Sequence, residues 1–273
     1  MCIFGLGIII TVVRHLSALA LCLAVMSLIG RAAGFAPWQA ASQVPIFGYT
    51  VVRTFPHDRD AFTQGLQVVE GAFYEGTGLN GRSSIRKVKI DTGEVLQKRD
   101  VPAQYFGEGI TVRGSELFQL TWQSGVALVY DKTTFAPKRQ FTYTGEGWGL
   151  TQDTTALIMS DGSEFLRFLD PRTFVEQRRV RVTASGAPLK NLNELEYVKG
   201  EVFANVWQTD YVARIDPKTG TVNGYIDFRG LLTPREREAT DVLNGVAYDE
   251  ATDRLFITGK LWPRVFEVRV TRK

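Results

Sequence analysis

Five short copies of one pattern recur along this chain, and their spacing restricts the possible folds more than any other feature of the sequence. In each copy a variable residue precedes a glycine, or Glu194 in the fourth copy, and an aliphatic residue follows. The variable positions are 64, 108, 148, 193 and 244, which lie 44, 40, 45 and 51 residues apart. Repeats of about 40 to 50 residues that each hold about four strands are typical of β-propeller blades.

The sequence between these copies consists of short alternating runs of apolar and polar residues, separated by glycine, asparagine, aspartate and proline. This alternation predicts half-buried strands, and sustained helical periodicity is almost absent. A second strand of each repeat is predicted at 73–77, 118–122, 158–162, 203–207 and 256–260. Outer strands, most of them after an aspartate turn, are predicted at 95–101, 138–143, 175–182 and 222–228.

The fifth repeat has room for only three strands, the last at 265–270, while an additional strand at 49–55 precedes the first repeat. We expect this N-terminal strand to complete the last blade as its outer strand, because pairing removes an exposed sheet edge. The sequence therefore predicts an all-β fold, a five-bladed β-propeller whose ring is closed by the N-terminal strand. The expected domain spans 49–273, after an N-terminal extension at 35–48, and carries a short exposed helix or loop at 231–240.

Residues 1–34 differ from the rest of the chain. They contain no acidic residue, place Arg14 and His15 before an apolar run at 16–29, and end in small residues around Ala32. This arrangement resembles a secretory signal peptide, and an uncleaved N-terminal membrane anchor is the alternative. In either case we expect an exported protein, periplasmic or extracellular, which remains attached to the membrane if the leader is not cleaved.

Several classes of function are disfavoured by what remains after this leader. Both cysteines, Cys2 and Cys22, lie within it, so the mature domain is expected to hold neither a disulfide nor a thiol nucleophile. His57 is then the only histidine, which argues against a histidine-ligated metal and against a serine or cysteine triad. Removing two of the 32 basic residues, against 29 acidic ones, lowers the net charge from +3 to +1, which gives no electrostatic reason to expect nucleic acid binding.

Two sets of equivalent positions are candidates for a functional site, because the inner strands of a propeller surround the mouth of its central channel. The first set is Gln64, Glu108, Trp148, Asn193 and Asn244. The second set, at the ends of the second strands, is Thr77, Trp122, Gly162, Trp207 and Lys260. Aromatic walls with a few placed polar groups are the usual form of a small-ligand pocket.

Each candidate also has a purely structural interpretation. A tryptophan on a strand often packs between blades, Lys260 by itself is as compatible with solvent as with a ligand, and Gln64 or Asn193 could satisfy backbone groups in the channel. Glu108 could be an exposed turn residue, but Gly107 and Gly109 on either side favour a close approach of backbone. A structural calcium ion is a further possibility, with oxygen ligands from acidic residues near loop ends. These residues are Glu146, Asp161, Glu194, Glu196, Asp210 and Asp241.

Six motifs in register resemble a known family, the plant-type glutaminyl-peptide cyclotransferases that also occur in bacteria. They lie at 62–66, 106–109, 121–123, 147–150, 192–196 and 258–262, within a resemblance that spans 44–270. The resemblance implies a five-bladed propeller, unrelated to the zinc-dependent animal enzymes, that converts an N-terminal glutamine into pyroglutamate and ammonia. The residues that match by motif position are Phe62, Gln64, Phe106, Glu108, Trp122, Trp148, Asn193, Trp207 and Lys260.

This reaction needs proton transfer more than it needs a cofactor, because the attacking α-amine and the amide carbon belong to one residue. The amine must lose a proton and the leaving nitrogen must gain one, so we expect Glu108 to carry the proton between them. Gln64, Asn193 and Lys260 are the expected donors to the oxyanion, and the residues Phe62, Phe106, Trp122, Trp148 and Trp207 are the expected walls of the substrate pocket. No metal or cofactor is expected in catalysis.

Two alternatives from other classes stay open at this stage. A non-catalytic, protein-binding propeller would explain the repeats without chemistry, and a calcium-dependent lactonase or hydrolase propeller would use channel carboxylates on a metal. For the cyclotransferase, the expected partners are peptides or proteins with an N-terminal glutamine, and the expected state is a monomer.

Overall fold

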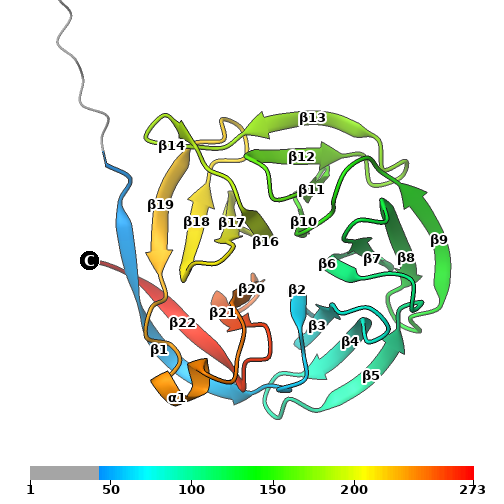
Figure 1. The fold of residues 1–273 in the computed structure, drawn as a ribbon, viewed down its shortest axis with the longest axis horizontal. Coiled ribbons are helices and arrows are strands. Elements are labelled where there is room, and N and C mark those ends of the chain that lie inside the picture. The colour runs from blue at the N-terminus through cyan, green and yellow to red at the C-terminus, as the bar shows by residue number, and fades with distance from the viewer. Residues whose placement is uncertain (1–42) are drawn as a thin grey trace, which may run out of the picture. The chain divides into compact units, whose positions relative to one another are not determined.

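The computed structural model describes residues 43–273, and the leader together with most of the predicted extension at 35–48 lies outside these residues. The described part is an all-β structure whose sheets are arranged in a ring. Figure 1 shows β2, β6, β10, β16 and β20 nearest the centre and β5, β9, β13, β19 and β1 along the rim. Among the described helices, none has the length and apolar character needed to cross a membrane.

Three of the sheets have four antiparallel strands each, in chain order from the centre outward. The first contains β2 (Thr63–Val69), β3 (Ala72–Thr77), β4 (Ser84–Lys89) and β5 (Val95–Asp100). The second contains β6 (Gly107–Arg113), β7 (Glu116–Thr121), β8 (Val126–Asp131) and β9 (Pro137–Thr142). The third contains β10 (Leu150–Gln152), β11 (Leu157–Met159), β12 (Phe165–Leu169) and β13 (Glu176–Arg181).

The fourth sheet has eight strands and joins two groups that each run from the centre to the rim. One group is β16 (Leu192–Val198), β17 (Glu201–Val206), β18 (Tyr211–Ile215) and β19 (Val222–Asp227). The other is β20 (Leu243–Asp249), β21 (Arg254–Gly259), β22 (Arg264–Arg272) and β1 (Ile46–Pro56). The N-terminal strand β1 pairs antiparallel with the C-terminal strand β22 and completes that group, which confirms the predicted closure.

Strand β1 starts three residues before the N-terminal strand predicted at 49–55. Strand β1 begins at Ile46, because Ile46 and Phe47 pair in parallel with Tyr225 and Ile226 of β19 and so join the two groups into one sheet. The sequence pattern predicted the antiparallel pairing with β22 but contained no signal for this second, parallel partner.

Most other strands lie within two residues of their predicted positions, with two differences. The strand predicted at 158–162 ends at Met159, although Ser160 still makes backbone hydrogen bonds with Trp148 and Gly149. A small hairpin of β14 (Thr183–Ala184) and β15 (Ala187–Pro188) was not predicted. The predicted insertion contains the short helix α1 (Pro234–Arg237), capped by Thr233 and Glu236.

The hydrophobic core lies between neighbouring sheets rather than in one central mass. For example, Tyr74 and Ile85 of the first sheet pack in one cluster with Ile110 and Leu128 of the second. Outer strands such as β9 expose most of their side chains, whereas inner strands such as β6 are almost entirely buried. Burial on both faces explains why the inner strands are rich in glycine and aliphatic residues.

Candidate active site

At one face of the ring, inner strands begin beside the ends of the second strands. In four of the strand pairs the first residue of the inner strand pairs with the last residue of the second strand. These pairs are Thr63 with Thr77, Gly107 with Thr121, Leu192 with Val206, and Leu243 with Gly259. The two predicted sets of positions therefore lie together at this face, as their equivalent places in the repeat suggested.

A β-bulge in each of these inner strands accounts for the direction of its polar side chain. The register shifts after Thr63, Gly107, Leu192 and Leu243, so that each strand has one extra residue at the predicted position. A bulge bends its strand and re-aims a side chain, and bulges are frequent beside active sites. Gln64, Glu108, Asn193 and Asn244 owe their placement to these bulges.

At this face, aromatic rings and one ammonium group form a continuous line of contacts. The Nζ atom of Lys260 lies 4.8 Å from the ring centre of Phe62, which lies 6.2 Å from the ring of Phe106 in an edge-to-face contact. Phe106 in turn lies 5.7 Å from Trp122. Four connections between strands thus contribute to one wall: β21 to β22, β1 to β2, β5 to β6, and β7 to β8.

Glu146 extends this wall to the remaining tryptophans. Its Oε2 atom accepts hydrogen bonds from the indole nitrogens of both Trp122 (2.7 Å) and Trp148 (2.8 Å), and its Oε1 accepts from Gln123. Trp148 contacts Trp207 edge to face at 5.5 Å between ring centres. Burial raises the pKa of Glu146, but the hydrogen bonds from Trp148, Gln123 and Trp122 outweigh it and lower the pKa below its ordinary value.

A buried polar group lies at the inner strands. Glu108 is only 5% exposed, and its Oε1 accepts a hydrogen bond from Nε2 of Gln64 at 3.1 Å. The Oε1 atom of Gln64 accepts from Nδ2 of Asn244 at 3.2 Å. One chain of hydrogen bonds therefore runs from Asn244 through Gln64 to the carboxylate.

Burial and the neighbouring charges favour a carboxyl group at Glu108 that can gain and lose a proton. Burial raises the pKa of Glu108 well above its ordinary value, with Lys260 opposing and Glu146 adding to the shift. Burial lowers the pKa of Lys260, and Glu108 and Asp241 oppose that shift. A buried carboxyl group and a buried amine that influence each other, inside an aromatic wall, match the usual pattern of a catalytic site.

The family model described as glutamine cyclotransferase matches residues 20–270. The chain belongs to the glutamine cyclotransferase family. A glutaminyl-peptide cyclotransferase of Arabidopsis thaliana is 45% identical over 228 residues, which cover 81% of this chain and 70% of that protein. The crystal structure of the Myxococcus xanthus glutaminyl cyclase matches with a TM-score of 0.77 and 35% identity, over 85% of this chain and 100% of that one.

In this member of the glutamine cyclotransferase family, the predicted site residues lie at one face of the ring. The wall contains Phe62, Phe106, Trp122, Trp148, Trp207 and Lys260, and the buried group contains Gln64 and Glu108. Asn193 is 3% exposed on β16, and its Oδ1 has no hydrogen-bond partner among the described residues. Of the remaining candidates, Thr77 bonds to Ser84 within its own sheet, and Gly162 lies directly against the Trp148 ring.

Glu146 is a member of this site that the sequence did not mark as functional, whereas Asn244 was a candidate position without an assigned role. Glu146 was considered only as a calcium ligand, although its position two residues before Trp148 is a signal that it could reach an indole. Asn244 belonged to the first set of positions, but no motif of the resemblance covered it. Among residues 43–273, no group of three or more histidine, cysteine, aspartate or glutamate side chains could hold a metal ion, and a structural calcium stays a prediction.

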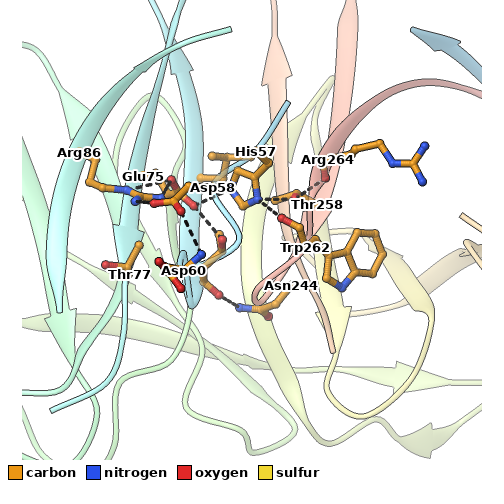
Figure 2. Close-up of polar contacts among 12 residues, drawn as sticks. His57, Asp58, Asp60, Glu75, Thr77, Arg86, Asn244, Thr258, Trp262 and Arg264 are labelled. Carbon is orange, nitrogen blue, oxygen red and sulfur yellow. Dashed lines mark hydrogen bonds and ion pairs between the residues drawn. The ribbon is translucent and has the colours of Figure 1, made fainter. Parts of the chain in front are cut away.

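Beside the site, a buried ionic network connects the first sheet to the turn between β21 and β22 (Figure 2). Arg86 donates to Glu75 (2.5 Å) and to Asp58 (2.6 Å), and Nε2 of His57 lies 3.0 Å from Glu75. Nδ1 of His57 lies 2.7 Å from the carbonyl oxygen of Trp262. Because a carbonyl oxygen only accepts, Nδ1 of His57 donates to Trp262, and Nε2 faces the carboxylate of Glu75.

The same network supports the end of the wall that Lys260 and Phe62 form. Trp262 lies two residues after Lys260, and the backbone N–H of Leu261 donates to the carbonyl of Ala61 at 2.7 Å, next to Phe62. Glu75 also accepts a hydrogen bond from Thr63 at 2.7 Å, directly before Gln64. The network thereby holds the segment of Phe62 to Gln64 against the turn that carries Lys260.

Proposed function

We propose that this protein is a glutaminyl-peptide cyclotransferase, which converts the N-terminal glutamine of a peptide or protein to pyroglutamate with release of ammonia. The observation that carries the proposal is Glu108, a buried carboxyl group with a raised pKa, located between a buried amide and a buried lysine at the face where the aromatic wall lies. Membership of the glutamine cyclotransferase family supports it, as do the names of the Arabidopsis and Myxococcus relatives.

In the proposed mechanism Glu108 transfers the proton. A free α-amine has a pKa of about 7.7 to 8.0, and burial raises the pKa of Glu108 well above its ordinary value, which lowers the cost of proton exchange between the two groups. The ionised carboxylate accepts a proton as the amine attacks the side-chain amide carbon. The resulting acid then donates that proton to the amide nitrogen, which leaves as ammonia.

The remaining residues bind the substrate and stabilise the oxyanion. Lys260 and Gln64 lie beside Glu108 and are the donors we assign to the tetrahedral intermediate, because donors in a desolvated site stabilise developing charge strongly. Asn193 is the third donor that we assign, and its side chain is buried at the equivalent bulge of β16. The tryptophans and phenylalanines exclude water and favour the bent conformer needed for ring closure.

We also propose that the ring is a five-bladed propeller, that the protein is exported, and that it works as a monomer. The blade assignment is supported by three four-stranded sheets and by the two four-stranded groups of the eight-stranded sheet. Export is supported by the composition of residues 1–34, which resembles a signal peptide.

The test is Glu108→Gln, assayed by ammonia release from a dipeptide with an N-terminal glutamine. The substitution keeps the volume and the hydrogen bond from Gln64 but removes the titratable group, so we expect turnover to fall by about 10²- to 10⁴-fold. Glu116→Gln is the matched control, because Glu116 lies on β7 and binds Arg139 away from the site. Near-native turnover by Glu108→Gln would overturn the assignment of the shuttle.

A further inference from the structure

Asn244 lies outside the six matching motifs, and the role inferred for it rests on the proposed function. Asn244 is fully buried at the bulge of β20, and its Nδ2 atom donates to the carbonyl oxygen of Thr63 at 3.0 Å. Since a backbone carbonyl only accepts, this contact fixes which end of the Asn244 amide is the nitrogen. The second hydrogen of the same nitrogen points to Oε1 of Gln64 at 3.2 Å.

The orientation of Asn244 then fixes the orientation of Gln64. With its oxygen held by Asn244, Gln64 can present only its nitrogen to Glu108, where Nε2 lies 3.1 Å from Oε1. All three side chains are 5% exposed or less, so water does not compete for these contacts. The backbone carbonyl of Thr63 thus fixes the orientation of the Asn244 amide, and Asn244 fixes that of Gln64. As a result, an N–H of Gln64 faces the carboxyl group of Glu108.

We propose that Asn244 is a positioning residue, which holds the Gln64 amide with its N–H toward Oε1 of Glu108 and so leaves Oε2 to carry the transferred proton. An N–H that donates to a carboxylate stabilises the ionised form, which is the form that accepts the proton of the amine. A flipped Gln64 would instead place its oxygen against Oε1, and that contact requires a proton on Glu108.

Other charged or titratable groups near Glu108 stay in place when Asn244 is changed. Lys260 lies in the turn after β21, Glu146 in the connection before β10, and Tyr143 after β9, and each interacts electrostatically with Glu108. None of the hydrogen bonds that these three side chains make involves Asn244. If substitution of Asn244 shifts the titration of Glu108, the shift therefore reports a change in the orientation of the Gln64 amide.

The experiment compares Asn244→Leu, which keeps similar volume without a donor, with the wild type. We expect the acid limb of the pH profile of kcat/KM to move up by about one pH unit, so that activity on that limb falls about tenfold. Asn205→Leu is the matched control, because Asn205 is also fully buried and bonds to the backbone of Gly245. A merely structural effect would lower activity in both variants without moving the limb.

A second readout does not depend on turnover. Infrared difference spectra against Glu108→Gln, recorded across pH, follow the protonated carboxyl band of Glu108, and its titration should move to higher pH in Asn244→Leu. An unmoved limb and band in the folded variant would overturn the proposal. If the wild type fails to cyclise, the proposed function fails, while the infrared titration still tests the amide orientation.

Asn244→Asp guards against a folding defect in the leucine variant. It is nearly isosteric and offers at most one proton to the two acceptors, so the same upward shift is expected. Loss of folding in both variants would assign Asn244 to the structure of β20 alone and would also overturn the proposal.

Discussion

Arg86→Met tests whether the buried ionic network stabilises the ring beside the site. Arg86 is 5% exposed and gives Nε and Nη2 to Glu75 and Nη1 to Asp58. Its loss leaves Glu75, 1% exposed, with His57 and Thr63 as its remaining partners among residues 43–273. Breaking a buried ion pair by removing one partner costs about 3–5 kcal/mol, so we expect the free energy of unfolding to fall by about 3 kcal/mol and Tm by about 6–12 °C.

The effect has a defined dependence on pH. Burial raises the pKa of Glu75, but Arg86 and His57 outweigh it, so the folded pKa lies well below the ordinary value. A carboxyl group with a lowered folded pKa contributes stability above its unfolded pKa of about 4.3, and loses that contribution as pH falls through the folded value. The difference between wild type and Arg86→Met should therefore be full at neutral pH and shrink below about pH 4.

Urea unfolding followed by tryptophan fluorescence measures this difference. The control is Lys98→Met, because Lys98 and Asp100 form an ion pair whose side chains are 51% and 75% exposed, and no measurable change is expected. The double variant Glu75→Met/Arg86→Met should recover much of the loss, since an apolar pair replaces a buried ion pair at little cost. A loss below about 1 kcal/mol for Arg86→Met would refute the reasoning.

Two further predictions concern the tryptophans of the substrate pocket and the role of a metal. Glu146→Gln should raise KM about three- to tenfold and change kcat less, because Trp122 and Trp148 lose the charged acceptor that holds both indoles; an equal fall in kcat at unchanged KM would contradict this role. Prolonged dialysis against EDTA should leave the rate of ammonia release unchanged, whereas loss of activity that returns with calcium would favour the metal-dependent alternative.

Regular spacing made much of the fold predictable from the sequence. The strands and their order follow from alternation and from the recurrence of one pattern, and equivalent positions in equivalent strands lie at the same end of the ring. The parallel pairing of Ile46 with Tyr225 could not be predicted in this way, because it joins two repeats through backbone groups and leaves no pattern in the side chains.

The polar partners of the site were harder to predict than its walls. Trp122, Trp148 and Glu108 occupy repeated positions, whereas the link between the two indoles comes from Glu146, which lies outside both sets of positions. Hydrogen bonds between amides, such as that of Asn244 to Gln64, depend on which atoms face each other across two blades. A sequence identifies the amides but not their orientation.

Glu194 shows most clearly how an equivalent position can change its role. The aligned glycines are required sterically, since a Cβ at Gly65 would lie 2.5 Å from the nitrogen of Ile110, and one at Gly109 equally close to that of Leu150. Glu194 instead reaches across to neighbouring inner strands, where its carboxylate accepts hydrogen bonds from the backbone of Leu66 (3.3 Å) and of Val246 (2.9 Å). These residues lie two positions after Gln64 and Asn244, so this carboxylate fixes the two bulged strands whose amides orient Glu108. In the one repeat that lacks this glycine, the glutamate therefore stabilises strands of other repeats by hydrogen bonds, whereas the glycines only allow the strands to pack closely.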